Sequence, residues 1–69
     1  MSGVAFVANG KTRVIADGAT VADVLCELKL GPSSVVVEHN GEPLGRERFT
    51  MTYIRDGDRL EIAQMVGGG

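Results

Sequence analysis

The chain has 69 residues, of which 43% are hydrophobic and 23% charged, and its formal net charge is −2. This length allows one small domain with little room for an internal active site. The seven basic residues are scattered, so the chain lacks the basic cluster that nucleic-acid binding needs, and a basic groove on a partner protein is the better electrostatic match.

A single cysteine, Cys26, excludes an internal disulfide, and the sequence has no Cys/His cluster for zinc. The longest aliphatic run, residues 35–37, is much too short to cross a membrane, and the N-terminus has no signal-peptide pattern. We therefore expect a soluble, cytoplasmic protein that binds neither nucleic acid nor membrane.

The first half of the sequence predicts a hairpin followed by a helix. Residues 4–8 are apolar and β-prone, residues 9–11 (Asn-Gly-Lys) are a turn signal, and residues 12–15 resume the β pattern. Thr20 is the expected N-cap of a helix that begins near Val21, with Asp23 completing a capping box. Apolar residues then recur at helical spacing, and Gly31, in the left-handed conformation, is expected to end the helix before Pro32.

The second half predicts two or three further strands. Residues 34–38 predict a central strand, residues 40–41 (Asn-Gly) a turn, and residues 42–52 a short edge segment with one helical turn near 46–49. Residues 59–66 predict a last strand with Leu60 and Ile62 facing inward. This order indicates an α+β fold of the β-grasp (ubiquitin-like) type, with a mixed sheet of four to five strands crossed by one main helix. We expect residues 1–66 to form the domain and residues 67–69 a flexible Gly-Gly-Gly tail.

Side chains offer few candidates for chemistry. Cys26 flanks the apolar helix stripe without a nearby His or Arg, which predicts a partly buried structural thiol. His39 is the only histidine and has no visible ligand or nucleophile partner, so a catalytic or metal role is not expected. Asp56, Gly57 and Asp58 indicate a sharp turn rather than a calcium loop, because no glutamate stands at the required spacing.

The best candidate for a reactive group is the terminal carboxylate of Gly69. Glycine has no Cβ, so Gly67 and Gly68 are suited to threading a channel too narrow for side chains. Three extended residues carry the carboxylate roughly 10 Å from the last packed residue. Strand alternation predicts that Met65 faces solvent, where it and Val66 would contact a partner. A frayed end or a linker is the plain alternative.

The closing stretches, residues 56–62 and 65–69, resemble the ThiS family, the ubiquitin-like sulfur carriers of thiamin biosynthesis. Residues 40–41 and 45–49 resemble the same family, and the similarity covers essentially the whole chain, including the helix capped by Thr20. The family more often has an aromatic residue where Met65 stands, so docking that depends on an aromatic side chain is altered here.

The resemblance implies that the carboxylate of Gly69 is adenylated, with ATP and Mg, by a separate E1-like adenylyltransferase of the ThiF type. Sulfur from cysteine, with a cysteine desulfurase as a further partner, then displaces AMP and leaves a terminal thiocarboxylate. That group gives its sulfur to a thiazole synthase of the ThiG type, which builds the thiazole ring. By the same resemblance the chain is a carrier and not an enzyme, and binds no cofactor or metal of its own.

Other readings of the tail stay open. A carrier that supplies sulfur for molybdopterin (the MoaD family) or for cysteine or methionine synthesis would share the same activation. A ubiquitin-like modifier would pass its carboxylate to a lysine, and a plain β-grasp binding module would not use its last glycines.

Overall fold

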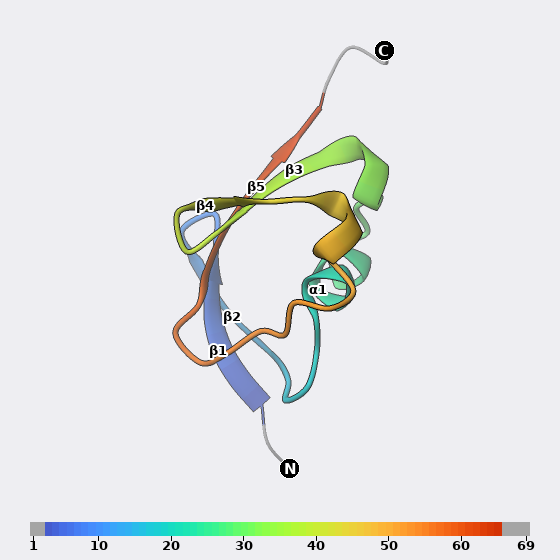
Figure 1. The fold of residues 1–69 in the computed structure, drawn as a ribbon. Helices are drawn as coiled ribbons and strands as arrows, with labels where there is room; N and C mark the ends of the chain where they lie inside the picture. The colour runs from blue at the N-terminus through green and yellow to red at the C-terminus, as the bar shows by residue number, and fades with distance from the viewer. Residues whose placement is uncertain (1–2, 66–69) are drawn as a thin grey trace.

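The computed structural model describes residues 3–65, which form one five-stranded sheet with a single α-helix packed against it (Figure 1). Residues 1–2 and 66–69 lie outside this description, so the predicted boundary after residue 66 and the predicted tail stay predictions. In chain order the elements are β1 (Gly3–Ala8), β2 (Lys11–Ala16), α1 (Val21–Glu27), the 3₁₀ helix η1 (Pro32–Ser34), β3 (Val35–His39), β4 (Glu42–Leu44), the 3₁₀ helix η2 (Arg46–Arg48) and β5 (Arg59–Gln64).

The last strand of the sequence is the central strand of the sheet. The strand order is β2-β1-β5-β3-β4, with β5 parallel to β1 and antiparallel to β3. The outer pairs, β1 with β2 and β3 with β4, are antiparallel hairpins. A mixed sheet of this order with one helix on it confirms the predicted β-grasp fold. The sheet has five strands, within the predicted four to five. Because β5 has a neighbour on each side, the last strand of the described residues is held along both of its edges.

Each hairpin closes through an Asn-Gly pair, as predicted. Asn9 and Gly10 have φ of 52° and 82°, and Asn40 and Gly41 have φ of 53° and 87°. Two successive positive φ values are typical of a two-residue type I′ turn, whose twist matches that of the flanking strands. Lys11, expected in the turn, is instead the first residue of β2 because two residues suffice to close the hairpin.

The start of α1 is as predicted, and its end is not. The Thr20 hydroxyl accepts a hydrogen bond from the Asp23 backbone N–H, and the Asp23 carboxylate accepts one from the Thr20 backbone N–H at 2.9 Å, which forms the capping box. The helix then ends at Glu27, four residues before Gly31.

Lys29, not Gly31, takes the left-handed position at the end of the helix, with φ of 60°. The Leu30 N–H bonds to the Leu25 carbonyl and the Lys29 N–H to the Cys26 carbonyl, the two hydrogen bonds of a Schellman motif. This ending directs the half-buried Leu30 against the core, which offsets the strain of a left-handed lysine. Gly31, with φ of −77°, instead precedes η1.

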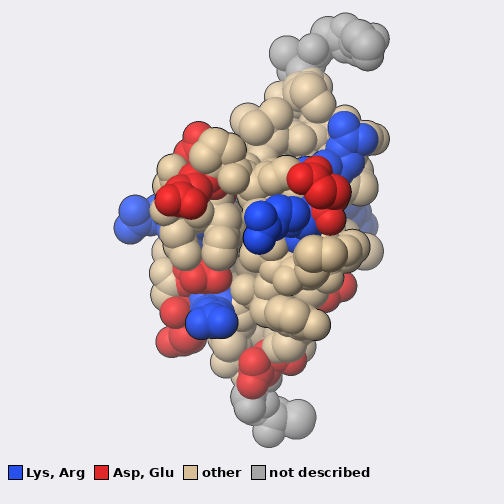
Figure 2. All heavy atoms as spheres, in the orientation of Figure 1, with Lys and Arg blue, Asp and Glu red and all other residues tan. Residues whose placement is uncertain are grey.

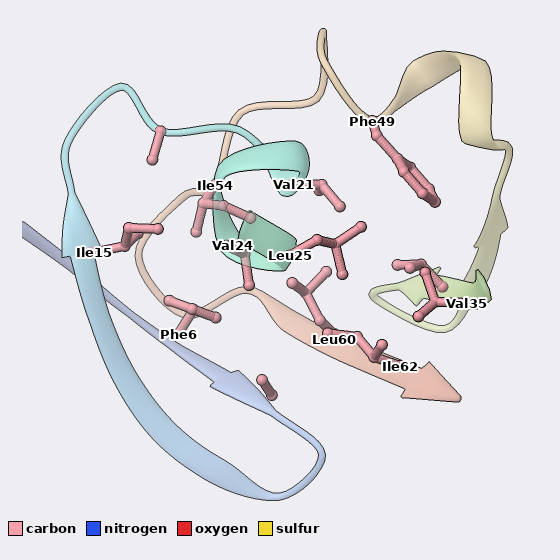
Figure 3. Close-up of a cluster of buried hydrophobic side chains, with 13 residues drawn as sticks. Phe6, Ile15, Val21, Val24, Leu25, Val35, Phe49, Ile54, Leu60 and Ile62 are labelled. Atoms are coloured by element: carbon pink, nitrogen blue, oxygen red, sulfur yellow. The ribbon is translucent and has the colours of Figure 1, made fainter. Parts of the chain in front are cut away.

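The core lies between α1 and the inner face of the sheet (Figure 3). Val21, Val24 and Leu25 of α1 are at most 1% exposed, and Leu60 of β5 is fully buried beneath them. Ile62 is also buried, so both inward residues predicted for the last strand are confirmed. Burial of such side chains contributes about 1.5–3 kcal/mol each, which makes the middle of β5 the anchor of the domain.

Cys26 is exposed, so the prediction of a partly buried thiol is wrong. Each helical residue is turned by about 100° from the one before it. The step from the buried Leu25 therefore carries Cys26 out of the apolar stripe and into solvent.

Candidate functional site

The candidate site is the end of β5, from which the chain continues toward the glycines. Gln64 pairs with Val35, and beyond it the Met65 N–H donates to the Ser34 carbonyl at 2.9 Å. The backbone is therefore held through Met65. The Met65 side chain is 54% exposed, which confirms that it faces solvent. The other predicted site residues, Val66, Gly67, Gly68 and Gly69, lie outside the described residues.

Asn9 holds β5 on the side of β1. Strand β1 ends at Ala8, and from there its backbone no longer runs beside β5. The Asn9 side chain instead makes the hydrogen bonds to the backbone of Ile62. Its Oδ1 accepts from the Ile62 N–H at 2.7 Å, and its Nδ2 donates to the Ile62 carbonyl at 2.9 Å. One side chain thus continues the β1–β5 ladder by a further step toward Met65.

Asn40 holds β5 on the side of β3. Its Oδ1 accepts from the Arg59 N–H at 2.9 Å, and its backbone N–H donates to the Arg59 carbonyl at 2.8 Å. The turn asparagines of the two hairpins therefore both bind the backbone of β5, Asn40 near the start of the strand and Asn9 near its middle. Since both contacts join residues far apart in sequence, turn signals alone could not reveal them.

The sheet face opposite α1 carries an apolar patch beside Met65. Val36 of β3 pairs with Ala63 of β5, and both point away from the core because their neighbours Val35, Val37 and Ile62 are buried. Val36 is 54% exposed. Met65 lies two residues beyond Ala63 and so on the same face. We call Val36, Ala63 and Met65 the sheet-face patch.

Two carboxylates border the sheet-face patch. Glu38 and Glu61 are exposed and stand directly opposite each other on β3 and β5. Like charges in such a pair repel slightly, and a cation supplied by a partner would relieve the repulsion. The patch therefore suits an apolar partner surface with a basic border, in line with the match expected from the net charge.

His39 and Asp58 form a small polar cluster at the other end of β5. His39 Nε2 lies 3.0 Å from Asp58 Oδ2, the one contact of this kind between a His, Lys or Arg side chain and a carboxylate within residues 3–65. Asp58 is 8% exposed and also accepts from the Arg55 N–H and the Asn40 side chain. Burial raises the pKa of Asp58, but the hydrogen bonds from His39, Arg55 and Asn40 outweigh it and hold the pKa below its usual 3.8.

Hydrogen bonds explain why both aspartates stand in this turn. Asp58 fixes the turn and ties it to the β3–β4 hairpin, while Oδ1 of Asp56 accepts from the Ala5 N–H. The prediction that turn chemistry accounts for both aspartates agrees with these bonds. Across residues 3–65, no three His, Cys, Asp or Glu side chains are grouped so as to hold a metal ion. No helix in the described part of the chain is long and apolar enough to span a membrane.

The fold identifies the broad class to which the protein belongs. The chain has the ubiquitin-like β-grasp fold, and it aligns with a TM-score of 0.55 and 20% identity with a protein designed on the template of human erythrocytic ubiquitin. That similarity concerns the fold alone. Within this class, the ThiS family model matches residues 4–69. The chain therefore belongs to the ThiS family of sulfur carrier proteins, as its resemblance implied.

Individual relatives agree with this assignment. The chain is 40% identical over 53 residues to the sulfur carrier protein ThiS of Bacillus subtilis, covering 77% of this chain and 80% of the relative. The crystal structure of the thiamine biosynthesis protein ThiS from Geobacter metallireducens aligns with a TM-score of 0.80 and 38% identity, over 96% of this chain and all of that one.

A further relative is much longer than this chain. The thiazole synthase of Paramagnetospirillum magneticum is 36% identical over 63 residues, which are 91% of this chain but only 19% of that protein. The chain thus spans about a fifth of the length of that relative.

Proposed function

We propose that the protein carries sulfur on the terminal carboxylate of Gly69 for thiamin biosynthesis. The observation that carries the proposal is the match of the ThiS family model to residues 4–69, which includes the last glycine. The held end of β5 supports it, because a rigid exit at Met65 fixes the point from which four further residues reach into a partner.

The chemistry requires activation by another protein. A carboxylate is anionic at neutral pH and a poor electrophile, so its oxygen must first become a good leaving group. An E1-like adenylyltransferase would join the Gly69 carboxylate to the AMP part of ATP and release pyrophosphate. The persulfide of a cysteine desulfurase would then attack the carbonyl carbon and release AMP, which joins the two proteins through an acyl disulfide. A second thiol would attack the desulfurase sulfur of that bond, form a disulfide with it and release the thiocarboxylate.

The carrier contributes reach and docking to these steps. ATP and Mg would bind to the adenylyltransferase, which supplies the phosphate contacts and stabilises the displaced charge. Gly67 and Gly68 would thread the narrow entrance, and Met65 and Val66 would contact the partner around it. Val36 and Ala63 extend that docking surface, since they share the exposed sheet face with Met65.

The proposed acceptor of the sulfur is a thiazole synthase. A stretch similar to 91% of this chain forms part of one polypeptide named thiazole synthase, which supports a working relation between a carrier of this kind and that enzyme. Loaded carrier, incubated with purified thiazole synthase and its other substrates, should lose its thiocarboxylate. If molybdopterin synthesis consumes it and thiazole synthase leaves it intact, the assignment to thiamin is wrong.

The threading step is tested by Gly68→Val. A β-branched side chain in the tail should leave the melting temperature unchanged but abolish thiocarboxylate formation. Gln64→Val is the matched control, because it adds the same side chain at an exposed position of β5 before the tail, and it should form product normally. Wild-type product from Gly68→Val, or equal loss in the two variants, contradicts threading.

The docking surface is tested by Val36→Asp. A carboxylate in the sheet-face patch, beside Glu38 and Glu61, should weaken binding to the adenylyltransferase at least about tenfold. Val14→Asp is the control, because Val14 is 68% exposed on β2, at the far edge of the sheet. Equal affinities of the two variants would contradict docking through this patch.

A further inference from the structure

The two edges of the sheet are protected to different degrees. Strands β2 and β4 form these edges, and an edge strand carries backbone N–H and C=O groups that can pair with another chain. Strand β4 has only three residues, and its Pro43 has no N–H to donate. Strand β2 has six residues and no proline, and its pairing with β1 continues without a bulge over all six. The β2 edge is therefore the edge that is open to pairing.

Every second residue of β2 turns its backbone N–H and C=O groups away from the sheet. In β1 the Val7 N–H donates to the Asp58 carbonyl at 2.8 Å, so the odd-numbered residues of β1 bond toward β5 and the even-numbered ones toward β2. The even-numbered residues of β1 pair with the odd-numbered residues of β2. The β2 residues whose backbone groups face outward are consequently the even-numbered ones, Thr12, Val14 and Ala16.

The charges along the β2 edge are separated by sign. Lys11 and Arg13 stand in its first half, and within residues 3–65 neither contacts a carboxylate. Asp17 directly follows the strand, and together with Asp23 and Glu27 it lines a hollow of about 480 Å³ between the end of β2 and α1. On the face of the molecule that Figure 2 shows, by contrast, acidic and basic side chains are interspersed. The β2 edge thus has a basic end and an acidic end.

We propose that the β2 edge binds the β2 edge of a second copy of this chain, so that the two sheets join into one. In an antiparallel pair centred on Val14, the two Val14 residues exchange both of their backbone hydrogen bonds. The Ala16 N–H of each copy donates to the Thr12 carbonyl of the other. The Ala16 carbonyl needs no partner there, because it already accepts from the Ala19 N–H at 3.1 Å.

Charge selects this register among the possible ones. It places Lys11 opposite Asp17 of the second copy, and it brings Arg13 to the acidic hollow of that copy. Both basic side chains lie on the α1 side of the sheet, since Ile15, which follows them in the alternation, is buried there. Pairs centred on Thr12 or Arg13 would set basic side chains directly opposite each other, which is destabilising. A pair centred on Ile15 avoids this repulsion but joins fewer residues of β2.

The second copy is the occupant that this edge fits. Val14 is 68% exposed, more than any other large hydrophobic side chain within residues 3–65, and it lies on the face opposite α1. In the proposed pair it is covered by its own equivalent, a cross-strand contact of two β-branched side chains. The basic end of each edge meets the acidic end of the other. Such self-complementarity is what a symmetric two-fold interface requires.

The proposed pair leaves the docking surface accessible in both copies. Strand β1 lies between β2 and β5, so the sheet-face patch takes no part in the pairing. Because β5 is parallel to β1 and β1 is antiparallel to β2, joining two β2 strands antiparallel puts the two Met65 ends at opposite ends of the joined sheet. Each copy can therefore offer its own strand end to a partner. The pairing does not depend on the proposed sulfur chemistry, so the isolated chain suffices to test it.

Sedimentation equilibrium tests the self-association. From about 10 µM to about 1 mM at low salt, the average mass should rise from that of one chain to that of two. It should stop at two, because the β4 edge is short and carries Pro43. A mass of one chain over the whole range, or growth beyond two chains, would overturn the proposal.

Exchange of charges tests the register. Lys11→Glu should raise the dissociation constant of the pair at least about tenfold, because it sets a carboxylate opposite Asp17. Adding Asp17→Lys to that variant restores opposite charges and should recover most of the affinity. Arg46→Glu, which makes the same change in net charge on η2 beside the other edge, is the matched control and should pair like the wild type. Equal loss in Lys11→Glu and Arg46→Glu, or no recovery in the exchanged variant, contradicts the proposed contact.

Cross-linking locates the centre of the pair without relying on charge. In a Cys26→Ser background, Val14→Cys puts two thiols on residues whose Cα atoms are about 5.5 Å apart, within reach of a disulfide. Oxidised glutathione, which is reduced as the disulfide forms, should convert this variant to a covalent dimer. Thr12→Cys is the matched control on the same edge, because its two copies would lie more than about 10 Å apart and should stay monomeric. Equal cross-linking of the two variants, or none in Val14→Cys, would refute the pairing, whatever the outcome of the sulfur-loading experiments.

Discussion

Replacing Asn9 with glycine measures how strongly the central strand is held. Asn9 lies at φ of 52° and its side chain makes two hydrogen bonds to the backbone of Ile62. Glycine adopts the same φ without strain, so Asn9→Gly removes the two bonds and keeps the turn. Each such bond contributes roughly 0.5–1.5 kcal/mol net. A left-handed asparagine is slightly strained, and glycine removes that strain, which offsets part of the free energy lost with the two hydrogen bonds. We therefore expect the free energy of unfolding to fall by about 1–2 kcal/mol.

That loss is large for this domain. At roughly 0.05–0.15 kcal/mol per residue, a chain of this size is stable by about 3–10 kcal/mol. Urea unfolding followed by far-ultraviolet circular dichroism measures the difference, and amide exchange of the Ile62 N–H should speed up with it.

Lys29→Gly is the matched control. Lys29 also has a positive φ, 60°, but none of the hydrogen bonds among residues 3–65 involves its side chain. Its replacement by glycine should change stability by no more than about 0.5 kcal/mol. If the free energies of unfolding of Asn9→Gly and Lys29→Gly agree, the Asn9 side chain does not hold β5 and the reasoning is refuted.

Three further predictions concern side chains outside β5. The pKa of Asp58 is lowered in the folded protein, so its contribution to stability is present above the unfolded value near 3.8 and is lost as pH falls through the lower folded value; Asp58→Asn should lower stability at pH 7 and flatten its fall in acid, as urea titrations at several pH values would measure. Thr20→Ala removes the hydroxyl of the capping box and should cost about 1 kcal/mol, and an unchanged urea midpoint would contradict this. Cys26→Ser should alter stability by less than about 0.5 kcal/mol and leave sulfur loading intact, because the thiol is exposed; loss of loading would make Cys26 part of the chemistry.

Local signals in the sequence predicted much of the fold. The Asn-Gly pairs, the Thr20–Asp23 box and the alternation around Leu60 each specify a conformation within a few residues, and all agree with the structure. The order of these elements was enough to indicate the β-grasp sheet.

Other features depend on contacts between distant parts of the chain. Lys29 is left-handed because Leu30 packs on the core, which no property of lysine indicates. The bonds from Asn9 to Ile62 and from Asn40 to Arg59 depend on the position of β5, and so does the pairing of His39 with Asp58.

The candidate site likewise has one part that the sequence predicted and one part that only the structure reveals. Alternation along the last strand was enough to predict that Met65 faces solvent. Val36 and Ala63 could join it only once the pairing of β3 with β5 was known. The roles of Val66 and the three glycines remain predictions that only chemistry can test.

The most direct test of the central claim is the mass of the C-terminal fragment after reaction with the adenylyltransferase, ATP and a sulfur donor. Replacement of oxygen by sulfur adds about 16 Da, and oxidation of a methionine such as Met51 or Met65 adds nearly the same mass. Alkylation with iodoacetamide in the Cys26→Ser background separates the two, because only the thiocarboxylate then reacts as a sulfur nucleophile. The account predicts one alkyl group on the fragment that ends at Gly69. A fragment that gains no alkyl group while sulfur transfer proceeds would contradict it.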